Sequence, residues 1–137
     1  MNAIIENLLT RRSTRAFLQK EIPDNELNEI LQAAIYAPSG MGKQTWKFTV
    51  LCNQEKIQQL AELIGRKLGR KGYDMYRPQV LIIPSNQKEN PHGMEDNACA
   101  LENIFLAAHS FGKAPGTTTE MGGSDSELQK QRSSGTA

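Results

Sequence analysis

The sequence has few of the residues that build disulfide frameworks, metal centres or membrane spans. It contains two cysteines, Cys52 and Cys99, which are too few for a disulfide framework or a four-cysteine metal site. We expect both to be buried free thiols in a reducing compartment. No apolar run approaches the roughly 18 residues that cross a membrane, and acidic Glu6 lies inside the first apolar stretch, which is not typical of a secretory signal. These absences predict a cytoplasmic protein without a membrane partner.

A strong charge of one sign is also lacking. Sixteen Lys and Arg residues against 15 Asp and Glu residues give a net charge of +1, so total charge does not indicate a nucleic-acid-binding protein. The two histidines, His92 and His109, have no second ligand at metal-binding spacing. We therefore expect no metal site. No triad or carboxylate pair can be singled out either, so a cofactor is expected to supply any redox chemistry.

Composition divides the 137-residue chain into two parts. Residues 1–112 carry the periodic apolar patterns of one folded domain. From 113 to 137, 13 of the 25 residues are Gly, Pro, Ser or Thr, and no helical or strand period runs through them. Such a segment cannot bury enough apolar area to offset the entropy of ordering it. We expect a disordered, low-complexity polar tail.

Apolar residues at helical spacing predict four helices in the folded part. Asn2, Asp24 and Asn53 are placed to cap the first three, and Gly112 to cap the C-terminal end of the fourth. The first is expected over about 2–10 and the fourth over about 96–111. Because the fourth is apolar around most of its circumference, it should be buried in the core or in a subunit interface.

Two β-branched and aromatic stretches, at 47–52 and 80–83, predict strands that are covered on both faces. Pro84 is expected to close the second strand. A sheet of two strands is not stable by itself. Either another subunit supplies further strands, or the chain lacks some.

The first segment suited to ligand binding is a basic cluster. Arg11, Arg12, Ser13 and Arg15 lie within five positions, and their side chains can donate several charge-assisted hydrogen bonds to a phosphate group. The alternative is a solvated basic turn at a helix C-terminus, where the helix dipole favours cations.

The second segment lies between the second predicted helix and the first predicted strand. It runs from Ala37 to Trp46 and contains Pro38, Ser39, Gly40 and Gln44, with a second glycine at Gly42. Glycines let a backbone approach a flat ligand closely. The alternative is a simple turn, because proline and glycine also mark turns.

Five stretches in order resemble the FMN-dependent nitroreductase family. The basic cluster is part of the first, and the late apolar helix is the last. They are Ile4–Phe17 (IIENLLTRRSTRAF), Ile22–Pro23, Ala33–Met41 (AAIYAPSGM), Gln44–Phe48 (QTWKF) and Asn97–Gly112 (NACALENIFLAAHSFG).

The resemblance implies an α+β fold, a nitroreductase-like α-β-α sandwich around a mixed sheet. It also implies an intertwined homodimer with FMN at the interface between the subunits. The resemblance covers about residues 1–112 and stops at Gly112, which indicates a truncated or frameshifted C-terminus. We therefore expect a partial FMN-binding domain, incomplete at its C-terminus.

The resemblance also assigns cofactor-binding roles, residue by residue. The basic cluster would hold the FMN phosphate and ribityl chain, and the Pro-Ser-Gly motif of the partner subunit would line the isoalloxazine ring. No catalytic side chain and no metal ligand are implied. The residues are Arg11, Arg12, Ser13 and Arg15 for the first role, and Pro38, Ser39, Gly40 and Gln44 for the second.

The implied activity is reduction of nitroaromatics, quinones or similar acceptors with NAD(P)H, carried by FMN. Two positions depart from the family: Gly42 stands where Asn is usual, and Thr45 where Pro is frequent. Together with the C-terminal difference, they predict impaired FMN binding and turnover. The alternatives are a non-catalytic flavin- or partner-binding remnant of the family and a product without function.

Overall fold

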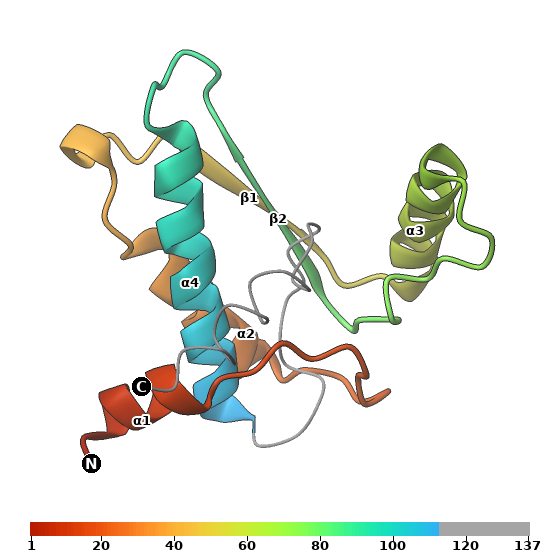
Figure 1. Ribbon diagram of the computed structural model, residues 1–137, viewed down its shortest axis with the longest axis horizontal. Helices are drawn as coiled ribbons and strands as arrows, with labels where there is room; N and C mark the ends of the chain where they lie inside the picture. Colours follow the sequence, from red (N-terminus) through yellow and green to blue (C-terminus); the bar gives the residue numbers. More distant parts are fainter. Residues whose placement is uncertain (113–137) are drawn as a thin grey trace, which may run out of the picture.

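The computed structural model describes residues 1–112, so the predicted tail at 113–137 lies outside the described residues. The described part alternates helices with two strands, as expected of an α+β protein (Figure 1). In chain order the elements are α1 (Ala3–Thr10), α2 (Asp24–Ile35), the short 3-10 helix η1 (Gly40–Gly42), β1 (Trp46–Leu51), α3 (Gln54–Leu68), β2 (Leu81–Asn86) and α4 (Gly93–Phe111).

Side-chain caps fix the starts of two helices as predicted. The Asn2 side chain accepts a hydrogen bond from the Ile4 N–H at 2.8 Å, and Asn53 accepts one from the Lys56 N–H at 3.0 Å. Each bond satisfies a backbone donor that the first helical turn leaves without an intrahelical partner. At its other end α3 is closed by Gly69 at φ +66°, the left-handed conformation that glycine adopts without steric cost.

Three helix ends differ from the prediction. Pro23 occupies the N-cap position of α2, so Asp24 is the first helical residue and makes no capping bond. α4 begins at Gly93 rather than at residue 96, because its first turn carries no apolar periodicity that the sequence could reveal. Gly112 follows α4 in an extended conformation, with φ −126°, and is not a left-handed C-cap.

The two strands form an antiparallel sheet. Its register runs from Trp46 opposite Asn86 to Leu51 opposite Leu81. The expected strand end at Pro84 is wrong, because β2 continues through it to Asn86. Each strand of a two-stranded sheet has one free edge, where a residue without an N–H is tolerated. The described residues supply this antiparallel pair of the implied mixed sheet.

The sheet lies between two groups of helices (Figure 1). Val50 and its cross-strand partner Ile82 pack with α2 and α4. The next pair, Leu51 and Leu81, packs with α3 instead. Successive residues of a strand point to opposite faces, so one face of the sheet meets α2 and α4, and the other meets α3 at this end of the strands. The expectation that both faces are covered is wrong for the rest of that second face, where Lys47, Thr49 and Ile83 are exposed.

The main core is the seam between α2 and α4. Residues four apart on α4 are buried there, against a matching pair on α2, and alanines let the two helices approach closely. The buried set is Ile30, Ala34, Ala37, Ile82, Ala100, Ile104 and Ala108. One stripe of α4 is therefore buried, while Met94, Ala98 and Cys99 on its other sides are exposed.

The expectation that both cysteines are buried is wrong. Cys52 and Cys99 are free, as predicted, but both are exposed rather than buried. Cys52 follows the last residue of β1, and Cys99 lies beside the buried stripe of α4 rather than on it. Within residues 1–112, no helix is long and apolar enough to cross a membrane.

Candidate functional site

The basic cluster begins where α1 ends against α4. Arg11 is the C-cap of α1. Its guanidinium lies 5.7 Å from the centre of the Phe105 ring, and its Nε lies 3.9 Å from Oε1 of Glu102. The Arg11 side chain is 18% exposed and the Glu102 side chain 48%. The ring and the helix therefore orient the guanidinium, while the ion pair is long and partly in solvent.

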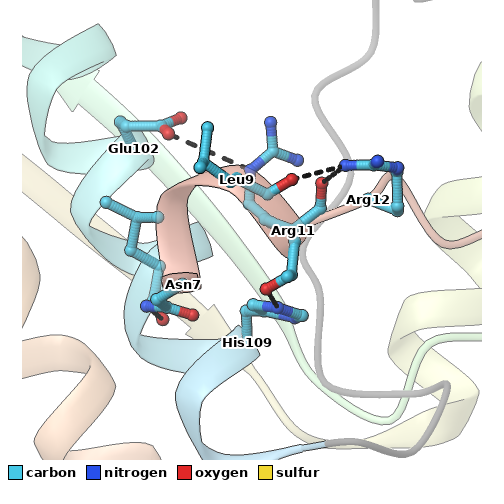
Figure 2. Close-up of polar contacts among 8 residues, drawn as sticks. Asn7, Leu9, Arg11, Arg12, Glu102 and His109 are labelled. Carbon is cyan, nitrogen blue, oxygen red and sulfur yellow. Dashed lines mark hydrogen bonds and ion pairs between the residues drawn. The ribbon is translucent and has the colours of Figure 1, made fainter. Parts of the chain in front are cut away.

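Two polar contacts fasten α1 to the C-terminal half of α4 (Figure 2). The Asn7 amide donates to the backbone carbonyl of Leu106 at 2.9 Å. The Thr10 hydroxyl lies 3.1 Å from Nε2 of His109. His109 thus has a packing partner and no metal-like surroundings. These contacts hold the basic cluster in a defined place although α1 has no buried residue.

The remaining residues of the cluster follow α1 along the surface. The Arg12 guanidinium curls back and donates to the carbonyls of Leu9 at 3.0 Å and Arg11 at 2.8 Å (Figure 2). Ser13 is half-buried and Arg15 is exposed. The cluster is a short cationic segment whose backbone carries no regular structure, beside the C-terminal half of α4.

The second predicted segment, the 38–44 loop, joins α2 to β1. Pro38 and Gln44 are exposed, and Ser39 and Gly40 are half-buried. The Ser39 hydroxyl accepts a hydrogen bond from the Gln44 N–H at 3.2 Å and so closes the loop on itself. Three of its residues have a left-handed backbone: Met41 (φ 57°), Gly42 (φ 65°) and Gln44 (φ 48°).

Gly40 joins this loop to the start of α4. Its N–H donates to Oδ1 of Asp96 at 2.7 Å. A Cβ atom at this position would lie 2.7–2.9 Å from the side chain of His92, closer than such atoms pack. Only glycine therefore brings the loop backbone to this place without displacing His92.

A set of polar side chains that sequence reasoning missed surrounds that contact. The Asn90 amide donates to Oδ2 of Asp96 at 3.1 Å and to Oγ1 of Thr45 at 2.8 Å. The Thr45 hydroxyl in turn donates to Oδ1 of Asn86 at 2.6 Å. We call Thr45, Asn86, Asn90 and Asp96 the polar network. The available signal was the unusual density of Asn and Asp between 86 and 97 beside a predicted buried helix.

The structure places the two predicted segments on opposite halves of α4. The 38–44 loop contacts Asp96 in the first turn, whereas Arg11 contacts Glu102 and Phe105. At 1.5 Å rise per residue, these points are roughly 9–14 Å apart along the helix. Figure 1 shows the loop near the start of α4 and α1 near its end. Each segment is assembled within one chain, but the two are not brought together.

Metal chemistry finds no support in the described part of the chain. No three His, Cys, Asp or Glu side chains within residues 1–112 come close enough to hold a metal ion. His92 packs its ring against Gly40. The two predicted segments contribute hydrogen-bond donors, cations and loop backbone.

Comparisons with known proteins place the chain among the nitroreductases. The sequence model of the nitroreductase family matches residues 8–75, which include both predicted segments. The chain is 31% identical over 110 residues to a Methanothermobacter thermautotrophicus protein provisionally named NADH dehydrogenase/NAD(P)H nitroreductase. It is 25% identical over 126 residues to a Bacillus subtilis FMN reductase [NAD(P)H].

The two alignments cover most of this chain but a smaller share of each relative. They take in 80% and 87% of this chain, but 56% of the archaeal protein and 49% of the bacterial one. The chain thus spans about half the length of these curated relatives.

Among solved structures, a Bacteroides fragilis nitroreductase with bound FMN is similar over the whole chain. The TM-score is 0.79 and the sequence identity 36%, and the match covers 100% of this chain and 82% of that one. Because identity at this level extends over most of a nitroreductase, the chain belongs to the nitroreductase family.

Proposed function

We propose that the protein is an FMN-dependent NAD(P)H oxidoreductase that reduces nitroaromatics, quinones or similar acceptors. The observation that carries the proposal is that one helix, α4, is contacted by a cationic segment on one half and by a glycine-containing loop on the other, and that both segments lie within the residues that the family model matches. The FMN bound in the Bacteroides nitroreductase supports the choice of cofactor, and the Bacillus FMN reductase supports the choice of electron donor.

The basic cluster fits a phosphate by its chemistry and by its present contacts. Arg11 is held on Phe105, and its ion pair with the half-exposed Glu102 is long and contributes little in solvent. Arg12 donates to backbone carbonyls at the end of its own helix. Both guanidiniums can exchange these weak contacts for charge-assisted bonds to phosphate oxygens. Ser13 and Arg15 would complete the set.

In our proposal the 38–44 loop supports the flat ring of the flavin. Gly42 has open space around the position of a Cβ atom, and Gly40 brings the backbone close to α4 without a side chain. Pro38, Ser39, Gly40 and Gln44 would line the isoalloxazine ring and present backbone and amide groups to its polar edge.

A homodimer would unite the two segments, and we include it in the proposal. Because they lie on opposite halves of α4, a second copy packed across this helix would bring its loop toward the basic cluster of the first. The exposed apolar side of α1 supports this arrangement. Its residues are Ile4, Ile5, Leu8 and Leu9, which are 45–69% exposed.

When bound, FMN supplies the hydride chemistry, by accepting two electrons from NAD(P)H and passing them to the acceptor. The chain's own residues would bind and orient it. The cations anchor the phosphate, the loop supports one side of the ring, and no side chain of the protein is assigned a proton-transfer role. The free, exposed Cys52 and Cys99 fit a reducing compartment, and we propose the cytoplasm.

An absorbance scan and a coupled assay test the proposal. The purified protein, incubated with FMN and desalted, should retain a flavin spectrum. It should then oxidise NADH or NADPH when p-nitrobenzoate or a quinone is added. Retention of FMN without oxidation of either nicotinamide would favour a non-catalytic flavin-binding role. No FMN retention and no quenching of FMN fluorescence on titration would reject the proposal.

A further inference from the structure

Asp96 is the one buried charged residue among residues 1–112, with 3% of its surface exposed. A buried carboxyl group is costly unless its oxygens receive hydrogen bonds. Here each oxygen receives one, from the Gly40 N–H at 2.7 Å and from the Asn90 amide at 3.1 Å. Both donors lie outside α4, so the side chain joins the helix to its surroundings rather than stabilising its own turn alone.

These bonds reach both ends of the segment that precedes β1. Gly40 is bound directly by Asp96. Thr45 is bound through Asn90, at 2.8 Å from its hydroxyl. Asn86 closes the network, because it accepts from Thr45 at 2.6 Å and donates to Gly93 at 3.2 Å and Asn97 at 3.0 Å. The polar network therefore holds the 38–44 loop at Gly40, near its start, and at Thr45, just after its end.

The loop needs such a clamp because its own backbone is strained. Met41 and Gln44 have positive φ values of 57° and 48°, which L-residues adopt only when the surrounding structure enforces them. Within the loop, the Gln44–Ser39 bond at 3.2 Å is the side-chain bond that favours this conformation. The short charge-assisted bond from Gly40 to Asp96 is a stronger restraint.

We propose that Asp96 is a positioning residue that, through the polar network, fixes the 38–44 loop in the conformation that receives the flavin ring. The inference rests on the proposed function for its ligand, and on the contacts above for its mechanism. Asp96 does not touch the ring; it acts through Gly40. The neutral alternative is an acidic residue that only favours the helix dipole in the first turn of α4.

The neighbouring Glu95 separates these two explanations. Both residues are acidic and lie in the first turn of α4, but Glu95 is exposed. Asp96→Asn and Glu95→Gln each remove one negative charge from the same turn at nearly constant volume. Asp96→Asn also places an amide where two donors now meet a carboxyl group, so it disrupts the clamp while Glu95→Gln leaves it intact.

The test is the affinity of each variant for FMN and for riboflavin, measured by quenching of flavin fluorescence. Riboflavin has the ring but no phosphate. Asp96→Asn should weaken both by about tenfold or more and by the same factor, because a charged hydrogen bond behind the ring site is lost. Glu95→Gln should change neither by more than about threefold. Equal effects of the two substitutions, or unchanged affinity in Asp96→Asn, would overturn the inference.

A second variant and a second measurement guard against misfolding and against failure of the proposed function. Thr45→Val removes the hydroxyl at the other end of the clamp and should also weaken FMN and riboflavin equally. Independently of flavin, amide hydrogen exchange at Gly40 should accelerate by about tenfold or more in Asp96→Asn, while exchange at Ile104 in the core stays unchanged. A parent protein that binds neither flavin rejects the proposed function, whereas unchanged Gly40 exchange rejects the clamp itself.

Discussion

At the scale of single residues, Arg11 is the clearest case of a charged side chain placed by packing rather than by a strong ion pair. Its guanidinium lies over the Phe105 ring, 5.7 Å from the ring centre, and this cation–π contact orients the charge. The 3.9 Å ion pair with half-exposed Glu102 contributes at most about 1 kcal/mol. A phosphate would compete successfully with such a partner.

Substitution of Arg11 or Arg15 should therefore weaken binding of the FMN phosphate and leave binding of the isoalloxazine ring unchanged. Arg11→Ala and Arg15→Ala are each expected to weaken FMN by about 1.5–3 kcal/mol per charged hydrogen bond lost, or about 10- to 150-fold in Kd. Riboflavin affinity should stay unchanged. Lys20→Ala, which removes an exposed cation a few residues further along, is the matched control. Unchanged FMN affinity in both arginine variants would contradict the assigned role.

The two loop glycines should respond to alanine for different reasons. Gly40→Ala places a methyl group 2.7–2.9 Å from His92, and this overpacking should destabilise the fold by about 1–3 kcal/mol. The methyl group added by Gly42→Ala would meet no atom, but the backbone at this position has φ +65°. The substitution should therefore lower the free energy of unfolding by about 1 kcal/mol through backbone strain. Urea unfolding measures both. If Gly42→Ala proved the more damaging, the close approach at His92 would not control this loop.

At the scale of secondary-structure elements, local signals in the sequence predicted some helix ends and not others. The capping roles expected of Asp24 and Gly112 were wrong. The caps at Asn2 and Asn53 are hydrogen bonds within three residues, so a single sequence reveals them. The start of α4 was missed because its first turn carries no apolar periodicity, and the passage of β2 through Pro84 was missed because it depends on tertiary context. The polar network was missed for the same reason, since Gly40 and Asp96 are 56 positions apart.

The α2–α4 seam should dominate the stability of the described domain. Ile104 is fully buried at its centre, and Ile104→Ala is expected to cost about 2–5 kcal/mol through lost burial and the cavity left behind. Leu63→Ala on α3 removes a side chain that is 53% exposed and should cost less than about 1 kcal/mol. Thermal or urea unfolding compares the two. Similar losses would mean that α3, rather than the seam, limits stability.

At the scale of the whole molecule, the shortage of strands that the sequence predicts is present in the described residues, which contain one two-stranded sheet. Exposed apolar side chains accompany it along α1, and Met94 on α4 is 86% exposed. Neither the family motifs nor the apolar periodicity of the sequence could predict how the parts of the fold are arranged relative to one another. The structure adds that the two predicted binding segments lie on different halves of α4, and the homodimer that we propose would bring them together.

Assembly and FMN binding should consequently fail together. The protein is expected to sediment as a homodimer at micromolar concentration, because a monomer would leave the α1 face in water. Leu9→Glu introduces a charge on α1 at a side chain that is 60% exposed in one chain, so it should leave each subunit folded but separate the subunits. Leu63→Glu, at a similarly exposed leucine on α3, is the control and should remain dimeric. Sedimentation velocity and FMN titration of both variants measure the link. A compact parent monomer, or a Leu9→Glu monomer that binds FMN as tightly as the parent, would show that one chain forms the site alone.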